Sequence, residues 1–290
     1  MSTALETDLE VAELEETARG RKWLHRRPAG APKVGTIVAV AVVILGFAWA
    51  FFPQLFTNQD PTVSTAAALE APSWQHWFGT DAMGRDLFTR VVYGSSSSLT
   101  AAVLAVLVGA TIGSLIGMIA GTVRGATDTI LMRFVDVLLS IPTLLLSLSV
   151  IILLGFGVVN AAIAVGVAAV ASFARLARSK ALQVANSDYV EAAYGSGSTF
   201  WQVLGRHVLP NSIGPILALA ALQFGSAILA ISTLSFLGYG AQPPNPEWGL
   251  IIAEGRNYLA TAPWLTLLPG AVLVAIVLST NHLSQGQDHA

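Results

Sequence analysis

The sequence of 290 residues contains no cysteine and very little charge, since only 11% of its residues are Asp, Glu, Lys or Arg. The absence of cysteine excludes disulfide bonds, thiol catalysis and cysteine metal sites. Soluble domains carry about 25% charged and about 45–50% apolar residues, whereas 54% of this chain is hydrophobic. That composition excludes an ordinary soluble globule and a disordered chain. The net charge of −2 gives no reason to expect a nucleic-acid partner.

The chain also lacks the residues that bind ATP, couple transport to ions or perform hydrolysis. A phosphate-binding loop needs a lysine preceded by glycine, and none of the three lysines follows one. Carboxylates that couple transport to ions usually lie at mid-membrane, but here only Asp128 and Asp136 lie near a hydrophobic run. We expect Asp128 to cap a helix and Asp136 to form an ion pair with Arg133 on the same helix face. No metalloprotease or serine-hydrolase motif occurs, so we predict no enzyme, no metal site and no cofactor in this chain.

Long uncharged runs stand in place of those features. About 20 apolar residues suffice to cross a membrane. The first run, Val34–Phe52, begins too far from the N-terminus to be a cleaved signal peptide. Later runs of similar length follow, the third and fourth separated by a turn at Gly155–Gly157. We therefore predict an all-α integral membrane protein with six transmembrane helices, at about 34–52, 97–121, 130–154, 158–175, 212–236 and 262–281.

The basic residues predict how these spans are oriented. With six spans both termini lie on one side, and placing that side in the cytoplasm puts 12 of the 15 Lys and Arg residues inside. Only Arg85, Arg90 and Arg256 remain outside. The predicted organisation is a cytoplasmic N-terminal tail (1–33), a first span with an external loop (34–96), a membrane core with a cytoplasmic loop at 175–211 (97–283), and a C-terminal tail (284–290).

Two external segments, about 53–96 and 237–261, are long and rich in Pro, Gly and Trp. Tryptophan side chains anchor at lipid headgroups, and long ordered loops also bind partners. The sequence alone leaves both readings open.

The cytoplasmic loop 175–211 contains the most distinctive pattern in the chain. The run Glu191-Ala192-Ala193 precedes a glycine turn at Gly195-Ser196-Gly197. We predict a short helix from about Ser187 to Tyr194 and a second one that stops before Pro210. The small alanine side chains allow a partner to approach closely.

The spacing of these residues resembles a known motif. Glu191-Ala192-Ala193, three residues, Gly197, nine residues and then His207-Val208-Leu209-Pro210 is similar to the EAA loop of ABC-importer permeases, with His207 at a position that is usually aliphatic. Phe78–Asp86 resembles an element of the C-type subunit of dipeptide and oligopeptide importers. Further similarities cover roughly residues 34–283, at Met132–Asp136, Ile141-Pro142, Leu234–Gly238 and Gln242–Gly249. The basic C-terminal tail usual in that family is missing.

The resemblance implies the type I ABC-importer permease fold and import of short peptides by alternating access across a bacterial-type cytoplasmic membrane. It implies a complex in membrane lipid with a B-type permease, two ATPase subunits that bind ATP and Mg, and an external substrate-binding protein. The resemblance implies an ATPase-coupling loop with Ala192 and Ala193 at the contact, Gly197 in the turn, and Glu191 capping the helix or pairing with a basic group of the partner. The residues of this loop are Glu191, Ala192, Ala193, Gly197, His207, Leu209 and Pro210. Those implied at the external gate or the binding-protein contact are Gly79, Asp81, Gly84, Arg85, Asp86, Gln242, Pro243, Pro244, Glu247 and Trp248.

Two alternatives stay open at this point. The same importer class could carry another substrate, such as nickel, glutathione or haem, because a separate chain recognises the substrate. A secondary transporter or channel fits less well, since mid-membrane carboxylates are missing and the EAA-like motif is present. Polar residues in the spans are candidates either for the substrate pathway or for helix packing: Thr111, Ser114, Ser147, Ser149, Gln223, Ser232 and Ser235.

Overall fold

The computed structural model describes residues 34–285 of the chain. The chain divides into two units, residues 1–37 and 38–290, and of the first unit only Val34–Ile37 is described. The predictions for the N-terminal tail and for residues 286–290 therefore lie outside the described residues. Within residues 34–285 there is no strand, and the only β-type pairing is an isolated bridge between Thr80 and Asp86.

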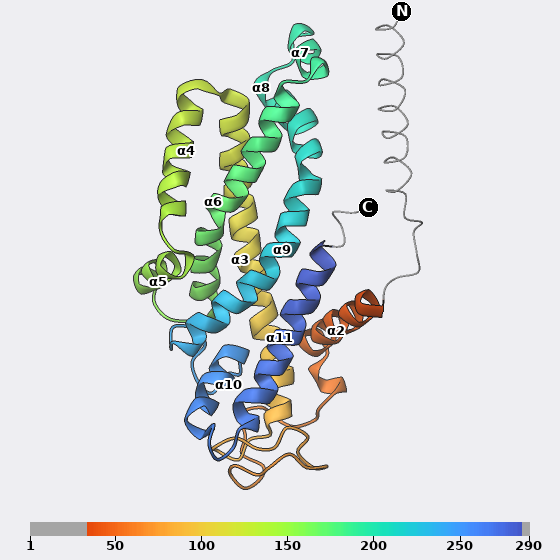
Figure 1. Cartoon of the computed structure of the whole chain (residues 1–290), viewed down its shortest axis with the longest axis vertical. Coiled ribbons are helices and arrows are strands. Elements are labelled where there is room, and N and C mark those ends of the chain that lie inside the picture. Colours follow the sequence, from red (N-terminus) through yellow and green to blue (C-terminus); the bar gives the residue numbers. More distant parts are fainter. Residues whose placement is uncertain (1–33, 286–290) are drawn as a thin grey trace, which may run out of the picture. The chain divides into compact units, whose positions relative to one another are not determined.

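The described residues form helices joined by short connections, with one long segment between the first two spans (Figure 1). Five helices of the described residues are long and apolar enough to cross a membrane, and the number is six if the bent pair α4–α5 counts as one span. The all-helical architecture is therefore as predicted. The elements are α2 (Val34–Phe51), η1 (Pro53–Leu55), α3 (Leu87–Val123), α4 (Gly125–Ser140), α5 (Thr143–Leu154), α6 (Val158–Ala185), α7 (Asp188–Gly195), α8 (Phe200–Val203), the π-helical turn η2 (Leu204–Val208), α9 (Leu209–Phe236), α10 (Trp248–Gly255), η3 (Arg256–Tyr258) and α11 (Trp264–Gln285).

The third predicted span, 130–154, is not one helix. Helices α4 and α5 meet at an angle of 98°. The cause is Pro142, whose ring disfavours a helical conformation in the residue before it, and Ile141 is accordingly extended, with φ −93° and ψ 128°. A new helix starts directly after the proline.

The predicted ends of three other spans also differ from the structure. Helix α3 begins at Leu87 rather than near 97, and α6 continues to Ala185 rather than ending near 175. Both extensions contain arginines that pair with carboxylates, Arg90 and Arg178. A prediction from uncharged runs ends each span before such an arginine. A helix can nevertheless continue through an arginine whose charge is neutralised by a carboxylate. The helix predicted to stop before Pro210 instead continues into α9, so that 200–236 forms one long span.

The continuation through Pro210 depends on the π-helical turn η2 directly before it. A proline inside an α-helix lacks its N–H and its ring collides with the carbonyl four residues earlier. In η2 the Leu209 N–H donates to the Leu204 carbonyl, which is one residue further back than in an α-helix. The wider turn lets the helix pass the proline without ending.

Helices α3 and α6 pack closely along a row of glycines, spaced four residues apart on one face of α3. A Cβ atom added to Gly113 or Gly117 would collide with the α6 backbone, at the carbonyl oxygens of Val170 and Ala174 respectively. Spacing by four places these residues on one helix face, and small residues there let two membrane helices approach to backbone contact. The row comprises Gly109, Gly113, Gly117 and Gly121.

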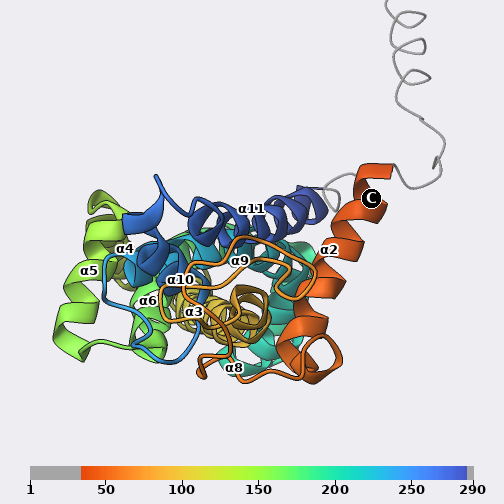
Figure 2. The same cartoon turned by 90° about the horizontal axis from the view of Figure 1, so that it is seen from below.

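Within residues 38–285, α7 and α8 lie at one end, and α10 lies with the segment 52–86 at the opposite end (Figure 1). Seen from the α10 end, α3 lies near the middle, with α6, α9 and α11 around it (Figure 2). The largest buried apolar cluster joins α3, α6, α9, α10 and α11, and a second one lies beneath α7. The two ends are thus separate regions on a shared helical core.

Candidate functional site

The segment formed by α7, α8 and η2, here called the coupling segment (188–208), is held by local backbone rules. At the end of α7 the Gly197 N–H donates to Tyr194 O (2.9 Å) and the Ser198 N–H donates to Ala193 O (3.0 Å). This pair of bonds is the Schellman arrangement, which needs a residue with positive φ, and Gly197 has φ +87°. Thr199 and Gln202 then form a capping box that starts α8. The glycine turn expected from the sequence is therefore present.

One face of the coupling segment is buried and the other is exposed. Val190, Val203 and Val208 pack with Phe173 and other apolar residues of α3, α6 and α9. This packing fixes the segment on the spans. The exposed face carries Glu191, Ala192, Tyr189, Tyr194 and Trp201, and the Trp201 side chain is 71% exposed.

The predicted contact residues of this segment divide between the two faces. Ala192 is exposed, but Ala193 packs against the buried cluster, so the two alanines do not form one contact pair. His207 lies against Tyr189, with ring centroids 5.7 Å apart, and therefore joins η2 to α7. Leu209 and Pro210 are exposed.

At the opposite end, the segment before α3 is a tightly folded turn. Gly79 and Gly84 both have positive φ, and a Cβ atom on either would collide with a backbone carbonyl, of Glu70 and Ala66 respectively. Asp86 is the N-cap of α3 and accepts a hydrogen bond from the Thr89 N–H at 2.7 Å. The glycines of this motif thus serve the turn itself.

A buried ion cluster connects this turn to α10. Asp81 Oδ2 accepts from Arg85 Nε at 2.6 Å and from Arg90 Nη1 at 2.8 Å. The same Arg90 nitrogen donates to Glu254 Oε2 on α10 at 2.6 Å. Arg90 is fully buried, and Asp81 and Arg85 are nearly so. Two arginines and two carboxylates leave no net charge in this cluster, as burial requires. It is here called the external ion cluster, after the orientation predicted from the sequence.

Glu247 and Trp248 attach the start of α10 to α3. The Glu247 carboxylate accepts from the Gly249 and Leu250 N–H groups at 3.0 and 2.9 Å, and Ser98 Oγ donates to it at 3.1 Å. Trp248 Nε1 donates to the Val91 carbonyl at 3.0 Å. Both side chains are completely buried.

Burial divides the residues predicted at the external gate or the binding-protein contact. The side chains of Asp81, Arg85, Asp86, Glu247 and Trp248 are buried, and the motif that carries them folds this end of the helical core. The side chains that are exposed at this end include Gln242, Pro243, Pro244, Met83, Trp74 and Trp77.

The predicted ion pair between Arg133 and Asp136 is wrong. Asp136 accepts from Arg175 Nη2 of α6 at 2.9 Å, and within residues 34–285 no ion pair of Arg133 is present. Asp128 is not the N-cap of α4 but lies in its first turn, where it accepts from Arg178 Nη2 at 2.6 Å. Both acids therefore connect α4 to α6, a pairing between helices that spacing along one helix does not reveal.

Three of the seven polar candidates in the spans serve their own helix. The hydroxyls of Thr111, Ser147 and Ser149 donate to the backbone carbonyls four residues earlier, and Ser114, Ser232 and Ser235 are buried between helices. Gln223 differs, because it lines a cavity.

We predict a pH effect on stability from Glu247. Burial raises the pKa of its carboxyl, against the opposing hydrogen bonds from Gly249, Leu250 and Ser98. A raised pKa means that the folded protein binds this proton more tightly, so the contribution of Glu247 to stability is fully present below about pH 4.3 and is lost as pH rises through its folded-state pKa. Glu247→Gln should flatten this fall. Thermal unfolding of the purified protein at a series of pH values measures it. Glu70→Gln, at an exposed carboxylate, should leave the slope unchanged, and an unchanged slope in Glu247→Gln would contradict the assignment.

Comparison with known proteins gives a family match and close relatives. Residues 113–288 match the family model described as binding-protein-dependent transport system inner membrane component. The chain is 40% identical over 248 residues to the probable D,D-dipeptide transport system permease protein DdpC of Escherichia coli (strain K12), covering 86% of this chain and 83% of the relative. It is 37% identical over 253 residues to the dipeptide transport system permease protein DppC of Alkalihalophilus pseudofirmus, covering 87% of this chain and 82% of that relative. The glutathione transport system permease protein GsiD of Pectobacterium atrosepticum is 40% identical over 254 residues, covering 86% of this chain and 84% of that relative.

Two solved structures share the fold at low sequence identity. An inward-facing MetNI methionine ABC transporter chain superimposes with a TM-score of 0.56 at 18% identity, covering 68% of this chain and 93% of that one. A chain of an amino acid ABC transporter crystallised with histidines superimposes with a TM-score of 0.52 at 16% identity, covering 68% of this chain and 92% of that one.

Proposed function

This chain belongs to the family of binding-protein-dependent transport system inner membrane components, and we propose that it imports short peptides as one membrane subunit of an ATP-driven importer. It is a permease subunit of an ABC importer, embedded in the membrane through several spans. Peptide import is supported by two relatives at 37–40% identity that are named as permeases for dipeptides.

In this proposal the exposed face of the coupling segment binds a separate ATPase subunit. The observation that carries it is the position of Ala192, Tyr194 and Trp201, which are exposed on a segment whose opposite face is anchored in the helical core. ATP binding would draw two ATPases together, move the coupling segments and open the permease pair toward the outside. Hydrolysis would then reset the inward-facing state. The ATP and Mg belong to those partner subunits.

The proposed complex contains a B-type permease, two ATPases and an external binding protein. Both termini of this chain would be cytoplasmic, in accord with the excess of basic residues on that side. The coupling segment then faces the cytoplasm, and α10 with the external ion cluster faces the binding protein. The exposed residues Met83 and Gln242–Asn245 are the ones we expect at that contact.

Glutathione is a second candidate substrate. It is a tripeptide, and the GsiD relative at 40% identity is named for its transport. A permease that accepts peptide main chains would fit either cargo, with the choice made by the binding protein.

Uptake by the reconstituted complex tests the proposal. The importer is assembled in proteoliposomes with its partner permease, ATPases and binding protein, and labelled dialanine is supplied outside together with ATP inside. We expect ATP-dependent uptake at least tenfold above the ATP-free control, with glutathione as competitor to rank the two cargoes. ATP-dependent uptake of nickel or haem in the absence of any peptide uptake would contradict the proposal.

A further inference from the structure

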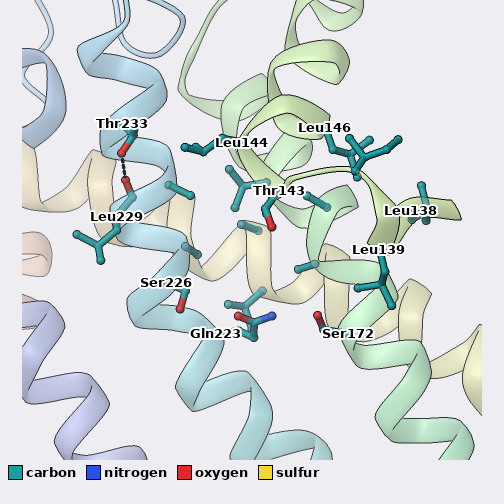
Figure 3. Close-up of a pocket in the computed structure, with 18 residues that line it drawn as sticks. Leu138, Leu139, Thr143, Leu144, Leu146, Ser172, Gln223, Ser226, Leu229 and Thr233 are labelled. Carbon is teal, nitrogen blue, oxygen red and sulfur yellow. Dashed lines mark hydrogen bonds between the residues drawn. The ribbon is translucent and has the colours of Figure 1, made fainter. Parts of the chain in front are cut away.

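A cavity of about 490 Å³ lies among four spans, away from both the coupling segment and the external ion cluster. Its size falls in the range of about 300–1,000 Å³ typical of small-molecule sites. Figure 3 shows it bounded by the end of α4, the start of α5 and the facing sides of α6 and α9. No charged residue lines it.

The cavity lies at the break in the third span. Leu139 at the end of α4 and Thr143 and Leu144 at the start of α5 line it on either side of the proline break. In membrane transporters, interrupted helices are found where they line a cavity or a substrate site.

Four polar side chains in the cavity have no hydrogen-bond partner within the described part of the chain: Thr143 at the start of α5, Ser172 on α6, and Gln223 and Ser226 on α9. Ser172, Gln223 and Ser226 lie at the same level of the cavity in Figure 3. By contrast, the Thr233 hydroxyl at its edge donates to the Leu229 carbonyl at 2.7 Å. An amide in an apolar region without a partner is costly, so the Gln223 carboxamide requires water or a ligand.

We propose that this cavity binds the main chain of the peptide during its passage, with the Gln223 carboxamide hydrogen-bonding a peptide group and Ser172 and Ser226 beside it. This rests on the proposed function of the chain. A carboxamide both donates and accepts, as a peptide group does, whereas a lipid chain would leave it unsatisfied. Neutral, largely apolar walls select no particular side-chain charge. The cavity therefore suits peptides of varied sequence.

Cysteine labelling tests the occupancy of the cavity. The chain has no cysteine, so Ser172→Cys creates a single thiol of nearly unchanged size, provided that the partner subunits are also cysteine-free. In the reconstituted complex we expect saturating dialanine, supplied with binding protein and ATP, to slow the reaction with a membrane-impermeant maleimide at least fivefold. Ser179→Cys, which is exposed on the same helix outside the cavity, should react at the same rate with and without peptide. Equal rates for Ser172→Cys in both conditions would overturn the proposal.

Transport kinetics provide an independent readout. Gln223→Leu should lower the rate of dialanine uptake about 3- to 10-fold, because one hydrogen bond to the cargo is lost, while ATP hydrolysis stimulated by the binding protein persists. Thr280→Val, on α11 outside the cavity and with its hydroxyl bonded to the Ile276 carbonyl of its own helix, should change uptake less than twofold. Uptake by Gln223→Leu within twofold of wild type would overturn the proposal. Failure of the proposed function would look different, because the wild-type complex itself would then import no peptide.

Discussion

Replacing Gly117 with leucine should prevent the chain from reaching a stable folded state. The glycine row brings α3 against α6 so closely that a single added carbon at position 117 would collide with the Ala174 carbonyl and lie 2.8 Å from the Arg178 amide nitrogen. Both atoms belong to the backbone, so no side chain can rotate away. Overpacking of a tight interface costs about 1–3 kcal/mol for small additions, and an isobutyl group would have to separate the helices along several turns. We expect no monodisperse protein after extraction in mild detergent.

A smaller matched pair tests the same cause. Gly117→Ala should lower the midpoint of thermal unfolding, whereas Gly270→Ala should leave it unchanged or raise it. A Cβ atom at Gly270 meets nothing within 4 Å, and alanine is intrinsically favoured over glycine in a helix by about 0.5–1 kcal/mol. The two variants add the same methyl group, but we expect only Gly117→Ala to lower the midpoint of thermal unfolding. An equal effect at both positions would refute the close-packing explanation.

Replacing Ala192 with tryptophan should reduce ATP-driven peptide uptake at least tenfold. The side chain is exposed on α7, in the face proposed to enter the ATPase, so a large ring there would block the fit without disturbing the fold. Disrupting a hot spot of a protein–protein contact commonly weakens the binding free energy by about 2 kcal/mol or more. This corresponds to at least tenfold weaker association. Uptake in proteoliposomes and co-purification of the ATPase measure the two consequences.

Ala126→Trp is the matched control for this change. Ala126 is also exposed, at the start of α4, and is not part of the coupling segment. It should retain normal uptake and normal ATPase binding. Ala193→Trp should instead destabilise the protein, since Ala193 packs against the buried cluster. Normal uptake by Ala192→Trp would refute the proposed contact.

The number of spans and their approximate centres follow from hydrophobic length alone, but their ends do not. Helices α3 and α6 are longer than their uncharged runs, because Arg90 and Arg178 are neutralised by carboxylates from other elements. The break at Pro142 was available from the sequence, since a proline restricts the residue before it. The four-residue spacing of the glycines was equally available, but which helix they face depends on the tertiary fold.

At the candidate site, the glycine turn at Gly197 was predictable from local backbone rules, whereas exposure was not. One sequence motif places Ala192 beside Ala193, and another contains Asp81, Arg85 and Asp86. Neither motif indicates which of these side chains are buried. The partner of Arg90 on α10, Glu254, lies 164 residues away in the chain. A signal for α10 itself was present, since Glu247 precedes an apolar run as an N-cap carboxylate would.

The unbroken helix from Phe200 to Phe236 has a structural consequence. At 1.5 Å per residue its 37 residues extend about 55 Å, with Trp201 at one end and Gln223 about 33 Å along it. The exposed Trp201 and the cavity residue Gln223 therefore stand on one continuous backbone, because η2 carries the helix past Pro210. Under the proposed function, the ATPase contact and the peptide contact share a single helix, with no loop between them.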